Sequence, residues 1–185
     1  MSVIVISFVT LDGIMTDPDG SSGSERGGWM FRFGREAVDG DPFRLGPILG
    51  EAVLLFGRGT WQHFARLWPT REGDFAERMN AATKLVATRA EFNASTWANS
   101  TALEGDLLDA VKNELRDVVL FGSLSVAREL AAADLVDEYR LVTFPTVVGS
   151  GEPLFAPNAP TAEFECVTAE PVGPLVLTVY RRTLS

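Results

Sequence analysis

Four short motifs combine glycine with arginine or hydroxyl side chains directly after an apolar run. They are "TLDG" at 10–13, "GRGT" at 57–60, "ATRAEF" at 87–92 and "FGSLS" at 121–125. At Gly57 and Gly122 a helical pattern follows, and the free N–H groups of a helix N-terminus favour an anion. Arg58 and Arg89 add guanidinium forks that match phosphate oxygens. Because ligands of open α/β sheets bind past the carboxyl ends of strands, these motifs predict a site for a phosphorylated cofactor.

Each motif alone is also typical of an ordinary tight turn, because glycine often follows a strand. The complete fingerprints G-x-G-x-x-G and G-x-x-x-x-G-K-[ST] do not occur in the sequence. An acidic residue after the second strand would bind a ribose 2′-hydroxyl, whereas Arg58 stands there and favours a 2′-phosphate. The pattern therefore favours NADPH over NADH.

The composition excludes several other kinds of chemistry. One cysteine, Cys166, and one histidine, His63, form neither an intrachain disulfide nor a zinc site of several Cys/His ligands. We interpret Cys166 as a small buried residue in a strand, and His63 as a surface or boundary residue without an acidic partner. The formal net charge of −9 makes nucleic acid an unfavourable partner.

The N-terminal segment "MSVIVISFVTLDG" has no basic start, and its apolar run is broken at Asp12. It has the features neither of a signal peptide nor of a membrane span of about 20 residues. We therefore expect a cytoplasmic protein without a membrane partner. The length of 185 residues, without repeat or linker, predicts a single domain over 1–185.

Eight segments have strand character. They are 3–10, 52–57, 84–88, 96–100, 118–121, 138–144, 163–168 and 175–182. The apolar early strands are typical of a parallel sheet that helices cover on both faces, although 96–100 is weak. The last two alternate more and are expected to pair antiparallel, because no helix separates them.

Helical patterns lie between the early strands. Asp106 is predicted to cap a helix whose apolar face extends to Leu115, and Thr60 to cap a helix that carries two tryptophans. Ser123 or Ser125 is predicted to cap the helix after 118–121. The order of elements predicts a three-layer α/β fold with a mixed, mostly parallel sheet.

The segment 17–34 is rich in Gly, Ser and Asp and has no core period. A loop of this length inside a compact domain is usually functional or mobile. We expect the loop with Trp29 to fold over another group rather than leave this side chain on a bare surface. After it, Asp41–Pro42 offers a helix start that Gly46–Pro47 interrupts.

These motifs together resemble the dihydrofolate reductase-like fold. The resemblance is strongest to the branch with the reductase domain of the bifunctional riboflavin-biosynthesis deaminase–reductase and its stand-alone relatives. The matching segments, in order along nearly the whole chain, are "VTLDGIM", "GGWMF", "LLFGRGTWQHFARLWP", "LFGSLSVARELAAADLVDEYRLVTFPTVVGSGEPLF" and "LVLTVYRR". The stretch from Leu120 to Phe155, with Pro-x-Val-x-Gly-x-Gly-x-x-Leu-Phe after its strand, is the most specific. The resemblance implies an eight-stranded sheet.

The resemblance also implies NADPH as hydride donor, a small-molecule substrate and compatibility with a homodimer. By match to the family's motifs, Gly57, Arg58 and Thr60 would contact cofactor phosphates. Thr88 and Arg89 would lie near the adenosine 2′-phosphate.

The remaining matched positions would face the nicotinamide and the substrate. Those expected on the cofactor are Phe8, Gly122, Ser123, Leu124 and Ser125. Thr10 and Asp12 would approach the reacting rings, the loop with Trp29 would cover them, and Asp41 is a candidate carboxylate for the substrate. Asp12 is equally well interpreted as a turn residue in "LDG".

Three functions fit these features. The first is an NADPH-dependent oxidoreductase that reduces a small heterocyclic or ribosylaminopyrimidine-like substrate by hydride transfer, which requires position and electrostatics rather than a nucleophile or metal. The second is a genuine dihydrofolate reductase. Relatives carry two or three glycines where this chain has Gly-Ser-Leu-Ser, so the third is a non-catalytic nucleotide-binding module on the same fold.

Overall fold

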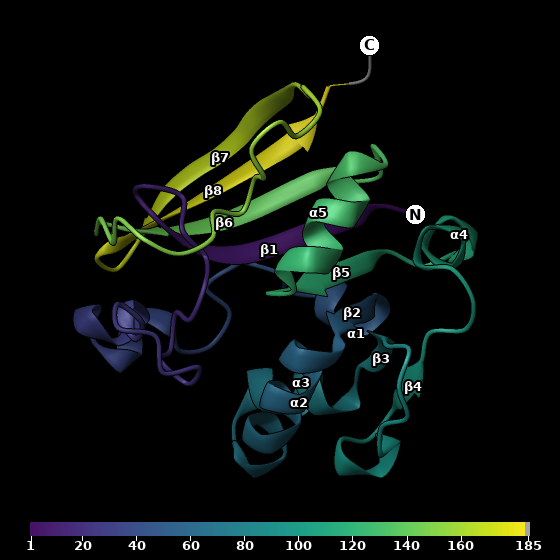
Figure 1. Cartoon of the computed structure of the whole chain (residues 1–185). Helices are drawn as coiled ribbons and strands as arrows, with labels where there is room; N and C mark the ends of the chain where they lie inside the picture. Colours follow the sequence, from purple (N-terminus) through teal and green to yellow (C-terminus); the bar gives the residue numbers. More distant parts are fainter. Residues whose placement is uncertain (184–185) are drawn as a thin grey trace.

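The computed structural model describes residues 1–183, which form an eight-stranded sheet of order β4-β3-β2-β5-β1-β6-β8-β7 (Figure 1). The strands are β1 (Val3–Thr10), β2 (Val53–Gly57), β3 (Thr83–Ala87), β4 (Ser100–Ala102), β5 (Val118–Phe121), β6 (Glu138–Phe144), β7 (Phe164–Val172) and β8 (Leu175–Arg182). In the order of the sheet, the six strands β4, β3, β2, β5, β1 and β6 are parallel to one another. Strand β8 then pairs antiparallel with both β6 and β7. This confirms the predicted fold class, although the weak strand lies at 100–102 rather than 96–100.

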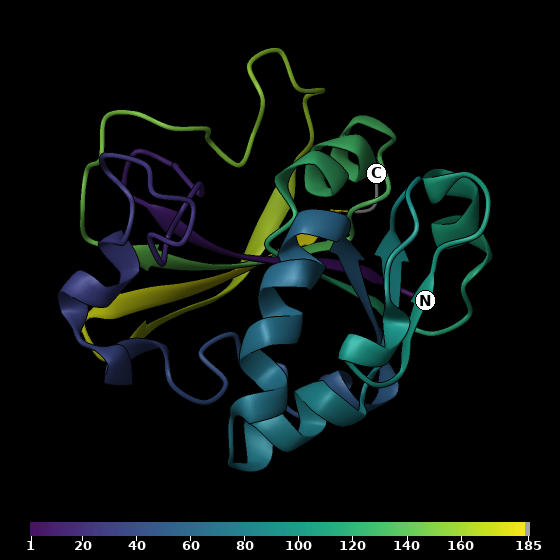
Figure 2. The ribbon, with the colours of Figure 1, turned by 60° about the horizontal axis from the view of Figure 1, so that its bottom comes forward.

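Helices cover both faces of the sheet, as the apolar runs predict (Figure 2). They are α1 (Ile48–Glu51), α2 (Arg58–Leu67), α3 (Asp74–Ala81), α4 (Leu107–Asn113) and α5 (Leu124–Ala132), with short 3-10 turns at Trp29–Phe33, Arg35–Val38, Trp68–Thr70 and Ala94–Thr96. In β1, Ile4 and Ile6 belong to the core beneath α1, α2 and α3, whereas Val3 and Val5 belong to the core beneath α4 and α5. Both faces of the central strands are therefore buried, and we expect ligands at an edge of the sheet.

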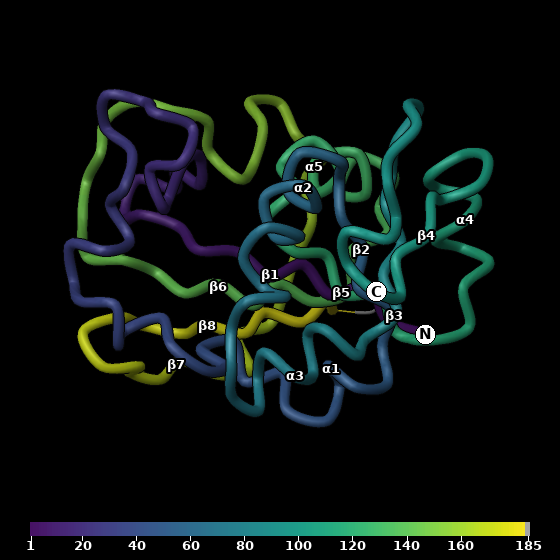
Figure 3. Tube along the Cα trace, turned by 90° about the horizontal axis from the view of Figure 1, so that it is seen from below, coloured from purple at the N-terminus to yellow at the C-terminus, as the bar shows by residue number. Residues whose placement is uncertain are grey.

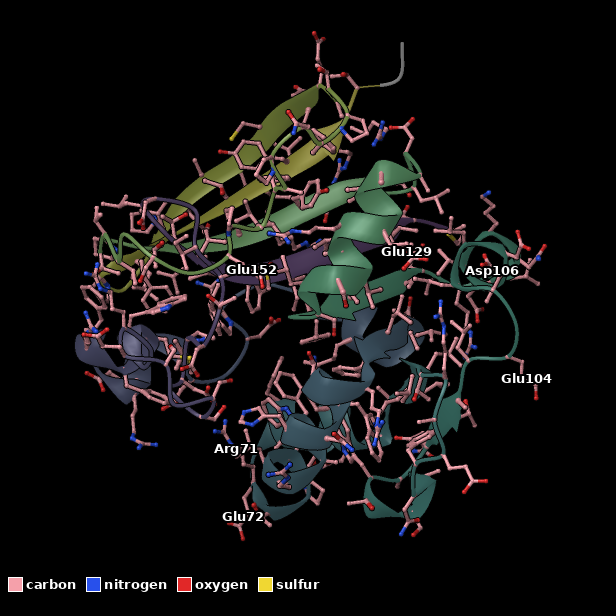
Figure 4. The ribbon with its side chains drawn as sticks, viewed as in Figure 1. Arg71, Glu72, Glu104, Asp106, Glu129 and Glu152 are labelled. Atoms are coloured by element: carbon pink, nitrogen blue, oxygen red, sulfur yellow. The ribbon has the colours of Figure 1, made fainter. Side chains whose placement is uncertain are left out.

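The predicted helix start is confirmed at α4 and, by position, at α5, where the helix begins after Ser123, but not at α2. At α4 the Asp106 carboxylate accepts from the N–H groups of Leu108 and Asp109, as expected, but Leu115 lies beyond the helix and is 91% exposed. The helix predicted to begin at Thr60 starts two residues earlier, at Arg58. Figure 4 shows Asp106 at α4, on the far side of the molecule from the strand-end loops that follow β1 and β6.

No helix begins at Asp41–Pro42, which corrects that prediction. Arg44 and Gly46 both have positive φ angles, 54° and 51°, which an α-helix excludes. The Asp41 Oδ2 atom accepts from the Gly46 N–H at 2.7 Å and closes a turn instead. Between Asp41 and β2, only the four residues Ile48–Glu51 are helical.

Cys166 is exposed, so its assignment as a buried residue is wrong. It lies on β7, which forms one edge of the sheet and contains no buried side chain. A β-bulge between Cys166 and Thr168, and Pro171 further along, interrupt the regular backbone of this strand. Bulges and prolines protect edge strands from pairing with other chains.

Two long connections meet where β1 and β6 end. Figures 1 and 3 show the segment after β1 beside the segment that joins β6 to β7. The Leu11 N–H donates to the Thr146 carbonyl at 2.9 Å, and the Met15 N–H to that of Glu152 at 3.1 Å. These contacts bring residues about 135 positions apart to the edge where the sequence motifs predict a ligand.

Candidate functional site

The carboxyl ends of β3, β2, β5 and β1 are adjacent, so the four sequence motifs lie along one edge of the sheet. Gly57 of β2 is in register with Ala87 of β3. Arg58 directly follows β2, and Thr88 and Arg89 directly follow β3. Neighbouring strands are about 4.8 Å apart, so the two corners where these strands end, one with Arg58 and one with Arg89, are side by side.

Both helices that start at this edge have N-termini without a side-chain cap. Helix α2 begins after Gly57 and helix α5 after Ser123, and no side chain of these two cap residues accepts a hydrogen bond from an N–H group of the first turn. Since β2 and β5 are neighbours, two sets of unsatisfied N–H groups lie close together. Such a pair can hold two phosphate groups, because the positive end of each helix dipole favours an anion.

The Ser123 hydroxyl connects the start of α2 to the start of α5 by hydrogen bonds. Its Oγ accepts from the Gly57 N–H at 2.7 Å and donates to the Phe121 carbonyl at 3.1 Å. The side chain is 5% exposed, so it points into the protein rather than into the edge. Serine at this position, where relatives usually carry glycine, therefore leaves the protein surface at the start of α5 open. The hydrogen bond with Gly57 also explains why the Ser123 side chain does not cap α5.

The rest of this corner has small or exposed groups. Gly122 is exposed with a φ of 55°, which favours glycine, and Ser125 is exposed. Leu124 is half-buried and packs against the core beneath α5. Thr60 lies in the first turn of α2, where its hydroxyl donates to the Gly122 carbonyl at 3.4 Å. The two corners are thus joined twice.

Arg58 and Arg89 are both exposed, and neither forms an ion pair with a carboxylate of residues 1–183. Thr88 is half-buried, and its hydroxyl closes a turn with the backbone of Ala90. Two unpaired guanidinium groups therefore extend from adjacent strand ends in a protein of net charge −9. This arrangement is what a bound phosphate requires.

Asp12 forms a clamp at the ends of β1 and β6. Its Oδ1 accepts from Thr10 Oγ1 at 2.6 Å and from the Val148 N–H at 3.2 Å, and its Oδ2 accepts from the Gly149 N–H at 2.7 Å. The Thr10 hydroxyl, and after it the two backbone donors, lower the pKa of this carboxyl below its usual value. An ionised carboxylate with three donors positions the neighbouring loop well and donates protons poorly.

The aromatic residues expected at the substrate side form one cluster. The half-buried Phe8 ring lies 4.8 Å from Phe43 and 5.5 Å from Phe144, between ring centroids. Trp29 is fully buried, its ring 5.1 Å from that of Phe144 and its Nε1–H donating to the Thr16 carbonyl. The indole thus anchors the long loop in the core, and contact between Trp29 and a substrate stays a prediction.

The structure places Asp41 near this cluster, in the turn that precedes Phe43. Its Oδ1 atom is buried and has no hydrogen-bond partner in residues 1–183, whereas Oδ2 is held by Gly46. A buried carboxylate oxygen without a donor is costly. Contact between Asp41 and a substrate stays a prediction.

His63 has an acidic partner, contrary to the sequence-based interpretation. Its Nε2 lies 2.8 Å from Asp19 Oδ2, which joins α2 to the loop after β1. The pairing spans two distant parts of the chain, so no local spacing indicates it. It connects the loop with the helix that begins at Arg58.

A cavity of about 350 Å³ lies between α5, Tyr139 and the segment 154–160, not at this edge. Figure 4 shows Glu152 beside α5, and its Oε2 accepts from Arg128 at 2.7 Å.

Among the described residues, no cluster of three His, Cys, Asp or Glu has metal-binding geometry. In the same part of the chain, no helix is long and apolar enough to cross a bilayer.

The family model of the RibD C-terminal domain matches residues 1–178. The chain belongs to the RibD C-terminal domain family. This confirms the resemblance inferred from the motifs. The uncharacterized protein YyaP of Bacillus subtilis (strain 168) is 29% identical over 111 residues, which cover 56% of this chain and 58% of YyaP. The chain thus spans under two thirds of the length of this curated relative.

Several solved structures share the fold of this chain. A putative riboflavin biosynthesis protein from Shewanella sp. PV-4 superposes with a TM-score of 0.77 at 20% identity, and each chain is covered completely. A pyrimidine reductase-like protein from Corynebacterium diphtheriae gives 0.61 at 15% identity, covering 100% of this chain and 92% of its own. RibD from Acinetobacter baumannii gives 0.67 at 12% identity, with 99% of this chain but 58% of RibD covered. RibD C-terminal domains are reductase-like. The three solved structures and this chain share one fold.

Proposed function

We propose that this protein is an NADPH-dependent reductase that transfers a hydride to a small heterocyclic, ribosylaminopyrimidine-like substrate. One observation carries the proposal: two uncapped helix N-termini and two unpaired arginines lie on adjacent strand ends at one edge of the sheet. Membership of the RibD C-terminal domain family supports the same reaction class.

The residues at the edge fit the phosphates of NADPH. The first-turn N–H groups of α2 and α5 suit the pyrophosphate, and the Ser123–Gly57 hydrogen bond holds the two corners at a fixed separation. Arg58 and Arg89 suit the adenosine 2′-phosphate, which distinguishes NADPH from NADH. NADPH supplies the hydride when bound, and the protein's task is to orient the reacting groups and exclude water.

Residues past β1 and β6 fit the substrate. Phe8 offers an aromatic surface for a flat ring, and Thr10 and Asp12 fix the loop that borders it. Because Asp12 is ionised and clamped, we expect the proton that completes the reduction to come from solvent or from the substrate.

The test compares the stabilisation by NADPH with that by NADH. A ligand that binds only the folded state raises the melting temperature with RT ln(1 + [L]/Kd), so NADPH should give the larger shift. Arg58→Ala and Arg89→Ala should reduce the NADPH shift and leave the small NADH shift nearly unchanged. Arg66→Ala is the matched control, because Arg66 is exposed in the last turn of α2, away from the edge.

Equal shifts with the two nucleotides, or an effect of Arg66→Ala equal to that of Arg58→Ala, would contradict the proposed cofactor site. NADPH oxidation is then followed with aminopyrimidine ribosyl phosphates, pterins and dihydrofolate. Turnover of the first class supports the proposal, and turnover of dihydrofolate alone supports a dihydrofolate reductase. NADPH binding without turnover of any of them supports a nucleotide-binding module.

A further inference from the structure

The cavity of about 350 Å³ lies against the C-terminal half of α5. Its walls are one side of the helix over 127–132, Tyr139 of β6 and the segment 154–160. Helix α5 starts with Leu124 at the candidate cofactor corner, and at 1.5 Å per residue Ala131 lies about 10 Å further along the helix. The cavity is therefore separate from the candidate cofactor site, and the proposed function does not use it.

The walls of this cavity are mostly apolar. Three alanines of α5 leave space that larger side chains would fill, and Pro157 and Pro160 contribute no backbone N–H to the opposite wall. Phe155 also lines the cavity, although 51% of its surface is exposed, so its ring lies where the cavity opens to solvent. Small-molecule pockets are typically apolar and about 300–1,000 Å³ in volume, so this cavity suits a single small ring system.

The charged side chains at the cavity are already paired or exposed. Arg128 Nη1 donates to Glu152 Oε2 at 2.7 Å and its Nη2 to the Pro153 carbonyl at 2.6 Å, which fastens the chain before the segment 154–160 to α5. Glu129 is exposed on the helix. Among the described residues that line the cavity, no unpaired cation attracts an anion, so the cavity favours an uncharged ligand.

One polar group in the wall lacks an acceptor. The Tyr139 side chain is buried with 4% of its surface exposed, and its ring centroid lies 5.2 Å from those of both Phe155 and Phe164. Burial raises the pKa of the Tyr139 phenol to about 12, as expected for a hydroxyl removed from water. This hydroxyl forms no hydrogen bond within residues 1–183, and a buried donor without an acceptor is costly. A ligand that brings an acceptor to it removes that cost.

We propose that this cavity is a binding site for a small, uncharged aromatic molecule that carries one hydrogen-bond acceptor, such as an aryl ketone. The ring lies between the alanines of α5 and Phe155, and the acceptor receives the hydrogen bond of the Tyr139 hydroxyl. The inference is independent of the proposed reductase function, because none of the candidate cofactor or substrate residues lines the cavity.

The test is an amide chemical-shift titration of the whole chain with acetophenone, which has a carbonyl acceptor, and with ethylbenzene, which has none. Both probes should shift amides of 127–132 and 154–160, and acetophenone should bind more tightly. Tyr139→Phe should weaken acetophenone binding about two- to tenfold, the effect of one neutral hydrogen bond, and leave ethylbenzene binding unchanged. Tyr180→Phe is the matched control, because Tyr180 is in register with Tyr139 on β8 and does not line the cavity.

Three further measurements decide between this site and other modes of binding. Ala132→Phe adds a ring to the cavity from an exposed helix position, so the variant should fold and lose the response to both probes. Benzoate should bind more weakly than acetophenone, and excess NADPH should not displace acetophenone. Equal affinities of acetophenone and ethylbenzene, equal losses in Tyr139→Phe and Tyr180→Phe, an unchanged response in Ala132→Phe, tighter binding of benzoate, or displacement by NADPH would each overturn the proposal.

Discussion

Replacing Lys84 with methionine should abolish a rise in stability that the wild-type protein gains between pH 8 and 10.5. Lys84 lies in β3, and its side chain is fully buried. Its Nζ donates to the carbonyls of Asn80, Ala82 and Ala98 at 3.0, 2.7 and 3.0 Å, and lies 4.5 Å from the ring centroid of Trp97. No carboxylate among residues 1–183 forms an ion pair with it, so burial of the charge is not offset by an opposite charge.

Burial lowers the pKa of Lys84 from its ordinary value of 10.5 to about 8. Below pH 8 the lysine is protonated in both the folded and the unfolded protein, so its effect on stability is constant. Between the two values the folded protein has lost the proton while the unfolded chain keeps it, so the free energy of unfolding rises with pH. One pKa unit corresponds to about 1.36 kcal/mol, so the full rise is about 3 kcal/mol.

The assay is urea denaturation at half-unit steps from pH 7.5 to 10.5, with wild type, Lys84→Met and Lys84→Arg. Arginine stays charged over the whole range, so both variants should lack the rise even if one is poorly stable. Tyr139, whose pKa burial raises to about 12, lowers stability above pH 10 in all three proteins and cancels in the comparison. Parallel pH profiles for wild type and both variants would refute the assignment to Lys84.

Two contacts at the candidate site, Ser123 with Gly57 and His63 with Asp19, give two further predictions. Ser123→Ala removes the acceptor of the Gly57 N–H and should cost about 1–2 kcal/mol in urea denaturation, whereas the exposed Ser125→Ala should cost little; equal costs would contradict this role of the Ser123 hydroxyl. His63→Gln and Asp19→Asn should each speed tryptic cleavage of the loop after β1, and the double variant should be no faster than either single one. Cleavage at the wild-type rate in both single variants would show that the pair does not restrain the loop.

Strand positions could be predicted because the sheet is covered on both faces. The apolar runs at 3–10 and 118–121 coincide with strands in the structure, since uninterrupted apolar residues have few alternatives in a two-sided sheet, and the more alternating segments 138–144 and 175–182 coincide with strands as well. The edge strands were predicted less well: β4 lies at 100–102 rather than 96–100, and Cys166 was assigned as buried although β7 has no buried side chain.

Helix starts and pairings were less predictable, because they depend on distant residues. Ser123 has the right type and position for a cap, yet its hydroxyl is taken by Gly57, 66 residues away. His63 pairs with Asp19 across 44 positions, and local sequence cannot show that contact. The motifs located the edge correctly because strand ends and helix starts are local features, whereas the hydrogen-bond partners of those residues are not.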